Sequence, residues 1–206
     1  MKELHVAYLE ALDKTEETDA IGHYTNEHLK LPGAYWCIGA LKLLNEEYSE
    51  RKEEVVGFIL ACQGEDGGFG GNLGHDSHIT NTLYAILVLA MYDSIDRLDK
   101  EKTVDFLLKL QKEDGSFMGD QWGEVDSRFS YCALSALSLL NALEKVDRIR
   151  ARDWLLRCQN TDAAFGAVPE AESHAAYTFC CVGALKILGD LDLLDLDKLG
   201  SWMSRR

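Results

Sequence analysis

Three short acid-serine-base triples are the part of this sequence whose residue types could do chemistry. They span residues 76–78 (DSH), 126–128 (DSR) and 172–174 (ESH), and each stands before a long apolar segment. Because aspartate and serine are good helix N-caps, each triple is predicted to start a helix. A base is slightly unfavourable there unless an anion is also bound, since helix N-termini attract negative charge. The triples therefore indicate an anion site, with phosphate as the first candidate ligand.

The base of each triple has two interpretations, which the sequence leaves open. It faces an anionic ligand, or it forms a structural salt bridge with a neighbouring carboxylate. The pattern favours the ligand for Arg128 and His174 and the salt bridge for His78. The chain carries a formal net charge of −14, from 21 basic and 35 acidic residues. An anion must therefore be held by such a local cluster, and no nucleic-acid partner is expected.

The elements that must position these triples repeat along the chain. Asp66, Asp114 and Asp162 lie in three similar turns and are 48 residues apart, which indicates an array. A partial copy from Tyr35 extends the array toward the N-terminus. We expect a single repeat domain over residues 1–206, with repeats near 24–70, 71–118, 119–166 and 167–206.

Each repeat is predicted to be a pair of helices followed by a glycine-rich turn. The inner helix, such as residues 129–140, is apolar on most sides, while the outer helix, such as residues 147–159, keeps a polar face. After the outer helix, an Asp-Gly turn reverses the chain, and Phe69, Phe117 and Phe165 are expected to fill the space between helices. No convincing β alternation occurs, so the fold class is all-α.

Composition excludes several classes of protein. A hydrophobic content of 47% and an aromatic content of 9% exclude a disordered chain. The apolar runs are too short to span a bilayer and the first residues lack a signal peptide's apolar core, so a cytoplasmic protein that does not cross a membrane is expected. Cysteines such as Cys62 and Cys158 recur at one repeat position, which indicates buried structural thiols.

Several ordered stretches resemble the β subunits of protein prenyltransferases. They are DGGFGG from Asp66, GHDSH from Gly74, the segment LQKEDGSFMGDQWGEVDSRFSYCAL from Leu110 and ESHAAYTFCC from Glu172. The likeness runs from about Tyr24 onward and is closest to the Rab geranylgeranyltransferase members of the family. It implies an α/α barrel, or toroid, of repeated helix pairs, of which this chain is expected to hold about four of six.

The resemblance also implies a function. In that family a β subunit pairs with a helical α subunit and transfers geranylgeranyl from its diphosphate to C-terminal cysteines of Rab GTPases, which an escort protein delivers. The corresponding residues here are His174 as a hydrogen-bond donor to the diphosphate, Ala175 and Ala176 in the lipid tunnel, Tyr177 beside them, Arg128 at the pocket wall and Trp36 near the far end of the lipid. Farnesyl-specific relatives carry a tryptophan close to the position of Pro32, which favours the longer lipid here.

Two departures from the family pattern limit these expectations. The zinc ligands of the family lie beyond the position of Arg206, so zinc is implied for a complete enzyme and no metal ligand or catalytic residue is expected in this chain. The chain by itself is expected to be inactive. Ala163 and Ala164 replace turn glycines. Either one alanine takes a positive φ, which costs on the order of 1 kcal/mol, or the loop adopts a different turn.

Other functions remain open at this stage. The first alternative is a shortened, non-catalytic paralogue that binds the lipid or the α subunit. A farnesyl-type prenyltransferase and a terpenoid cyclase are less favoured. A cyclase would need acidic residues in its tunnel, and the acidic run near Asp195 is expected on a solvated outer helix.

Overall fold

The computed structural model describes residues 1–14, 20–46 and 49–205. The chain divides into two compact units, Met1–Asp99 and Lys100–Arg206. The first unit contains α1 (Lys2–Lys14), α2 (Ala20–Asn26), α3 (Lys30–Leu43), α4 (Lys52–Ala61) and α5 (Ile79–Met91). The second contains α6 (Lys100–Lys109), α7 (Ser127–Leu139), α8 (Arg148–Arg157), α9 (Ala175–Leu188) and α10 (Leu196–Met203). Short 3-10 helices and isolated β-bridges accompany them, and no β-strand occurs in the described ranges, so the predicted all-α class is confirmed.

The 48-residue period is exact in the structure. The outer helices begin at Lys52, Lys100, Arg148 and Leu196. A residue with positive φ follows the end of each inner helix, at Asn45, Asp93, Asn141 and Gly189. Asparagine, aspartate and glycine tolerate this left-handed conformation best, which explains why only they occur there.

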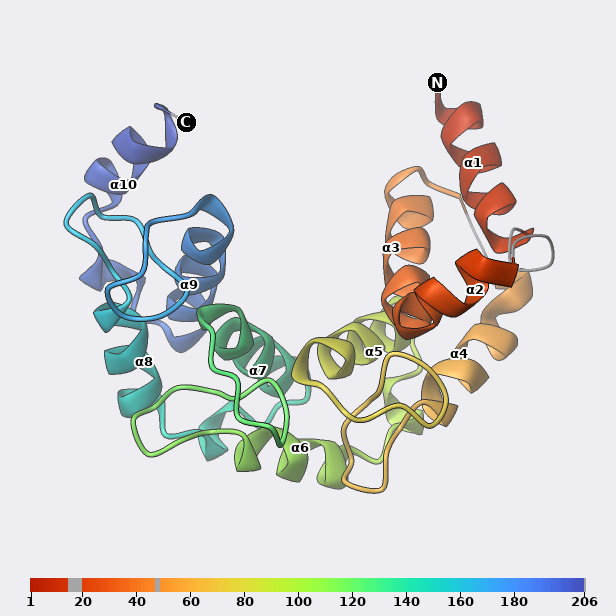
Figure 1. Cartoon of the computed structure of the whole chain (residues 1–206), viewed down its shortest axis with the longest axis horizontal. Helices are drawn as coiled ribbons and strands as arrows, with labels where there is room; N and C mark the ends of the chain where they lie inside the picture. Colours follow the sequence, from red (N-terminus) through yellow and green to blue (C-terminus); the bar gives the residue numbers. More distant parts are fainter. Residues whose placement is uncertain (15–19, 47–48, 206) are drawn as a thin grey trace. The chain divides into compact units, whose positions relative to one another are not determined.

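Inner helices lie side by side within each unit, α3 with α5 and α7 with α9 (Figure 1). Their apolar faces supply much of the core, and residues such as Ile86 and Leu134 are fully buried. A Cβ atom at Gly183 would lie 2.8 Å from the ring of Tyr131, so the glycine permits the close approach of α9 to α7. Outer helices bury one face only, as in α8, where Trp154 and Leu155 are buried.

Each glycine-rich turn holds a phenylalanine with no exposed surface: Phe69, Phe117 and Phe165. The expected plugs are therefore confirmed. The third turn keeps the conformation of the others despite its alanines, because Ala163 has a φ of 73° where Gly115 has 91°. A different turn at this loop is thus excluded, and Ala163 bears a cost of about 1 kcal/mol.

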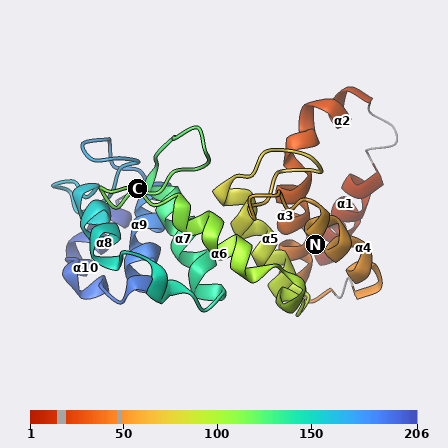
Figure 2. The same ribbon diagram turned by 90° about the horizontal axis from the view of Figure 1, so that it is seen from below.

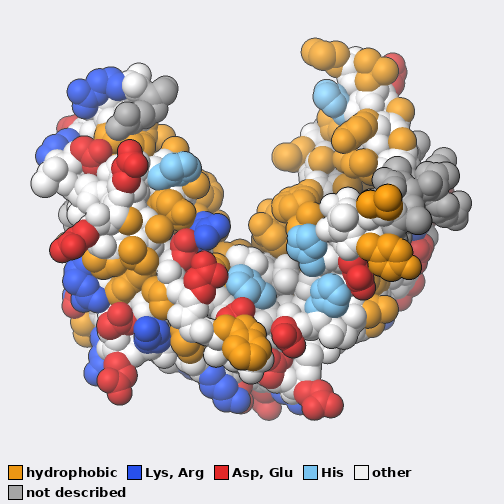
Figure 3. Space-filling model, in the orientation of Figure 1, with side chains coloured by type: hydrophobic (Ala, Val, Ile, Leu, Met, Phe, Trp, Pro, Cys, Tyr) orange, Lys and Arg blue, Asp and Glu red, His pale blue; other side chains and the backbone are white. Residues whose placement is uncertain are grey.

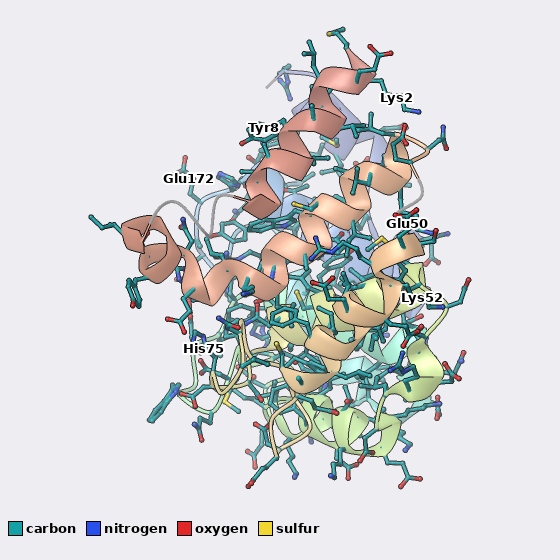
Figure 4. All side chains as sticks on the ribbon, turned by 90° about the vertical axis from the view of Figure 1, so that its right-hand side faces the viewer. Lys2, Tyr8, Glu50, Lys52, His75 and Glu172 are labelled. Atoms are coloured by element: carbon teal, nitrogen blue, oxygen red, sulfur yellow. The ribbon has the colours of Figure 1, made fainter. Side chains whose placement is uncertain are left out.

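Apolar side chains also gather on the surface of α1 (Figure 3). Leu4, Tyr8 and Leu12 are spaced one helical turn apart, and all three are exposed. The Lys2 ammonium lies 2.9 Å from the Glu46 carboxylate, which ties α1 to the segment after α3. Lys2 and Tyr8 both belong to α1 (Figure 4). No helix among the described residues is both long and apolar enough to cross a membrane.

The six cysteines are free thiols, as expected of structural residues. Burial raises the pKa of Cys62 to about 11 and that of Cys132 and Cys158 to about 12. Cys180 is half-buried, and burial raises its pKa to about 11. Because thiolates react and thiols do not, these side chains are suited to packing.

Candidate functional site

The residues that cap two of the inner helices, α5 and α9, differ from the sequence expectation. The N-caps of α5, α7 and α9 are His78, Asp126 and His174, so an acid or serine caps only α7. Each cap lies nine residues after the plug phenylalanine and 48 residues from the next cap. The triples are therefore out of register, because His78 and His174 share a position with Asp126 and not with Arg128.

The two histidine caps work as acceptors. Nδ1 of His78 accepts a hydrogen bond from the Thr80 N–H at 3.2 Å, and Nδ1 of His174 accepts one from the Ala176 N–H at 3.1 Å. An Nδ1 that accepts carries no proton, so the ring proton of His174 lies on Nε2. Both rings thus use Nδ1 to cap their helices, and of the three triples only that of α7 places an arginine at the helix start.

The serines of the triples reinforce the turns. The hydroxyl of Ser77 donates to Asp66 at 2.7 Å, and that of Ser173 donates to Asp162 at 2.8 Å. Ser127 instead begins α7, and its hydroxyl donates to the Gly166 carbonyl at 3.1 Å. This bond joins the start of α7 to the turn before α9, consistent with the neighbouring loops of the second unit in Figure 2.

Arg128 forms a two-pronged salt bridge with Asp126. Nε donates to Oδ1 at 2.9 Å and Nη2 donates to Oδ2 at 2.7 Å. The side chain of Asp126 is 7% exposed and that of Arg128 is 47% exposed. The hydrogen bond that Arg128 donates to Asp126 raises the pKa of the guanidinium above its ordinary value. Arg128 therefore forms the structural salt bridge that was one of its two interpretations, while nearly half of its side chain still faces solvent.

The structure brings together Arg128, Tyr177 and His174, which the resemblance assigned to the lipid diphosphate site. The guanidinium carbon of Arg128 lies 5.6 Å from the centre of the Tyr177 ring, a distance typical of a cation–π contact. The imidazole of His174 lies 5.4 Å from the same ring on its own helix. We call these three residues the α7–α9 cluster. An aromatic ring flanked by an imidazole N–H and a guanidinium can bind a phosphate group together with adjoining apolar atoms.

The remaining predicted site residues divide between the two units. Ala175 and Ala176 form the exposed first turn of α9, directly beside the α7–α9 cluster. Trp36 belongs to α3 of the first unit, is 51% exposed and meets the ring of Tyr84 edge-on at 6.3 Å. Pro32 is buried on the same helix. The proposed contact of Trp36 with the lipid therefore stays a prediction.

Sequence reasoning missed the role of Asp126. It treated the acid of each triple as a cap and left open a salt bridge between Arg128 and a neighbouring carboxylate, without identifying Asp126 as that carboxylate. The constant spacing of nine residues from the phenylalanine to the cap would have aligned His78 and His174 with Asp126. A base two residues after an N-cap acid can fold back onto it, which is the signal that was available.

The described residues provide no set of metal ligands. No three histidine, cysteine, aspartate or glutamate side chains within residues 1–14, 20–46 and 49–205 group as a metal site. Most cysteines also have pKa values that burial raises, which disfavours the thiolate that zinc requires. The zinc that the resemblance implies does not fit these residues.

Comparison with known proteins places this geometry in a family. Residues 1–206 match the family described as prenyltransferase alpha-alpha toroid domain. The chain is 45% identical over 95 residues to the geranylgeranyl transferase type-2 subunit beta of Schizosaccharomyces pombe, a match that covers 46% of this chain and 30% of that protein. It is 43% identical over 101 residues to the corresponding Saccharomyces cerevisiae subunit, covering 48% of this chain and 30% of that one. The matched stretches thus span less than a third of these curated relatives.

A solved structure has a similar fold. The Candida albicans protein geranylgeranyltransferase-I, in complex with GGPP, superposes with a TM-score of 0.78 at 20% sequence identity. The match covers 92% of this chain and 60% of that chain. At this identity the likeness supports the α/α fold, and the curated relatives bear on function.

Proposed function

The chain belongs to the prenyltransferase alpha-alpha toroid family, and we propose that it forms part of the β subunit of a type-2 geranylgeranyl transferase. In this proposal it acts with an α subunit and binds geranylgeranyl diphosphate, whose lipid is transferred to C-terminal cysteines of Rab GTPases presented by an escort protein. The carrying observation is 43–45% identity to β subunits of that name over about half of the chain. A cytoplasmic location follows from the same proposal.

The α7–α9 cluster is the proposed site of the diphosphate. The proton on Nε2 of His174 is a donor that its helix cap does not use, because the cap uses Nδ1. Arg128 supplies a permanent positive charge from the neighbouring helix. The start of α9 adds the positive end of a 14-residue helix. All three contributions favour an anion, although the chain as a whole is strongly acidic.

The start of α9 also suits a lipid next to a diphosphate. Ala175 and Ala176 are small and exposed, so they leave room beside the cluster. One turn further, Phe179 is 65% exposed and meets the ring of Tyr131 edge-on at 5.5 Å. Apolar surface of this kind next to an anion site matches the two ends of an isoprenoid diphosphate. The zinc of the complete family enzyme has no ligand set among the described residues, so the proposal concerns the diphosphate end of the reaction.

A pair of matched substitutions tests this site. Asparagine retains an acceptor for the helix cap, so His174→Asn removes the imidazole donor without uncapping α9. We expect the affinity for geranylgeranyl diphosphate, measured by calorimetry, to fall about tenfold, the loss of one hydrogen bond to a charged group. His78→Asn makes the same change at the cap of α5 and should leave the affinity unchanged.

Two outcomes would overturn the proposal. One is a wild-type chain that binds no geranylgeranyl diphosphate. The other is an equal loss of affinity in His78→Asn and His174→Asn, which would show that the effect comes from helix capping in general. Thermal melts of both variants serve as the control for folding.

A further inference from the structure

We propose that Asp126 is a positioning residue for the diphosphate site: it holds the Arg128 guanidinium against Tyr177, so that the free edge of the guanidinium is presented to the anion. This inference rests on the proposed function and deepens it. It assigns a role in anion binding to a carboxylate, a group that repels anions when it acts alone.

The burial of Asp126 is more than a helix cap requires. Asp147 and Asp195 cap α8 and α10 with side chains that accept N–H bonds at 3.1 and 3.0 Å, and both residues are exposed. Asp126 accepts its cap bond from Arg128 at 2.7 Å while only 5% exposed. Burying a carboxylate is costly unless it is paired. Its partner, the guanidinium of Arg128, accounts for a buried acid at this position.

Contacts on several sides fix the guanidinium. The carboxylate of Asp126 takes Nε and Nη2. The guanidinium carbon lies 5.7 Å from the ring centre of Phe129 and 5.6 Å from that of Tyr177. The carboxylate bonds use neither hydrogen of Nη1, so this nitrogen is the donor that Arg128 offers to a ligand.

The start of α7 is itself anchored to the segment that leads to His174. The N–H of Ser127 donates to the Ala167 carbonyl at 2.8 Å, and the Ser127 hydroxyl donates to Gly166. The N–H of His174 donates to the Phe165 carbonyl at 3.0 Å. The starts of α7 and α9, which carry Arg128 and His174, are therefore both hydrogen-bonded to residues 165–167. Because Asp126 lies next to Ser127 and accepts two hydrogen bonds from the guanidinium, it fixes the position of the guanidinium relative to this backbone.

Electrostatics and positioning predict opposite effects of neutralising Asp126. Asp126 and Glu124 are the carboxylates whose charges act on Arg128. If charge alone mattered, Asp126→Asn would make the site more positive and strengthen anion binding. If Asp126 positions Arg128, the same change weakens binding, because the asparagine NH2 group cannot accept from Nη2 and the fork is lost.

The test measures binding of geranylgeranyl diphosphate and of inorganic pyrophosphate by calorimetry. We expect Asp126→Asn to bind both about tenfold more weakly, the loss of one charge-assisted hydrogen bond. Asp195→Asn, which neutralises an exposed cap in the same unit, should bind like the wild type. In an Arg128→Ala background Asp126→Asn should have no further effect. Unchanged or tighter binding in Asp126→Asn would overturn the inference.

A second measurement does not depend on a ligand. The Nε–H of Arg128 should give a slowly exchanging NMR signal in the wild type that disappears in Asp126→Asn and persists in Asp195→Asn. A signal that survives in Asp126→Asn overturns the positioning role. A wild-type chain that binds neither probe refutes the proposed function, and the Nε–H signal still decides whether Asp126 holds Arg128. If Asp126→Asn does not fold, Arg128→Lys, which keeps the charge and loses the fork, should show the same weakened binding.

Discussion

The segments 62–82 of the first unit and 158–178 of the second have the same local structure in different surroundings. In both, the N–H of the plug phenylalanine donates to a threonine hydroxyl at 3.0 Å, to Thr82 or to Thr178. In both, the cap histidine donates its N–H to the phenylalanine carbonyl at 3.0 Å. The same backbone conformation and the same histidine cap thus occur in both segments, and the hydrogen bonds within the repeat are sufficient to explain them.

The two segments differ in what surrounds the cap histidine. The ring of His78 faces the Thr80 hydroxyl at 2.8 Å, whereas Ala176 has no polar side chain at that position and the His174 ring faces Tyr177. Tyr177 in turn contacts Arg128 from the neighbouring helix. The repeat therefore accounts for the capped start of each helix, whereas the candidate site at His174 depends on its neighbours Tyr177 and Arg128.

The largest expected effect comes from breaking what the two segments share. Phe69→Ala and Phe165→Ala each remove a fully buried ring, and we expect each to lower the free energy of unfolding by about 3–5 kcal/mol. Urea denaturation followed by circular dichroism measures the loss. Similar losses at both sites would confirm that the plug is equivalent in the two segments. A loss under about 1 kcal/mol at either site would contradict the burial argument.

A smaller loss of stability is expected from a substitution at Asp162, the aspartate of the third glycine-rich turn. Asp162 accepts from the Ser173 hydroxyl and, through Oδ2, from the Trp202 indole N–H at 2.8 Å. Although burial raises the pKa of Asp162, hydrogen bonds from Ser173, Ala164 and Trp202 lower it overall. Asp162→Asn should cost about 1 kcal/mol at pH 7, a modest value because the carboxylate is partly solvated.

The pH dependence of this cost follows from the sign of the shift. A carboxyl group whose pKa is lowered in the folded state stabilises the fold above its ordinary pKa of about 4, and this stabilisation is lost as the pH falls below that value. The difference between wild type and Asp162→Asn should therefore narrow below about pH 4. Denaturation series from pH 7 to pH 3 measure it. A difference that is constant over this range would rule out the charged form of Asp162 as its source.

The smallest effect concerns the turn residue with positive φ. Ala163→Gly should stabilise the second unit by about 0.5–1 kcal/mol, because glycine adopts a φ of 73° without steric strain. Gly115→Ala is the contrasting variant, since a Cβ atom there would meet the Arg150 carbonyl oxygen at 2.0 Å. The melting temperature should be higher than that of the wild type for Ala163→Gly and lower for Gly115→Ala. A lower melting temperature for Ala163→Gly would show that Ala163 is not strained.

Several features were accessible from the sequence because they are local or periodic. The plug phenylalanines, the buried thiols and the helix pairs follow from apolar spacing and from the 48-residue repeat. The family resemblance assigned Arg128, Tyr177 and His174 to one site, and the start of each inner helix already marked Arg128 and His174. The assignment of the caps was wrong at His78 and His174, because a histidine Nδ1 can replace a carboxylate as acceptor and residue type alone does not show this.

The sequence by itself determined the all-α class and the repeat, because periodic burial and turn chemistry act over a few residues. The residues near the start of α9 were named from the triples and from the family resemblance. Only the tertiary structure decided how these residues are used. It paired Arg128 with a buried Asp126, and it set Tyr177 between that guanidinium and the imidazole of His174. It also left the Ser130 hydroxyl buried with no hydrogen-bond partner among the described residues, where Thr82 and Thr178 each accept from a phenylalanine N–H. Such partnerships depend on which helices pack together, and that is decided by the packing of the whole unit and not by local sequence.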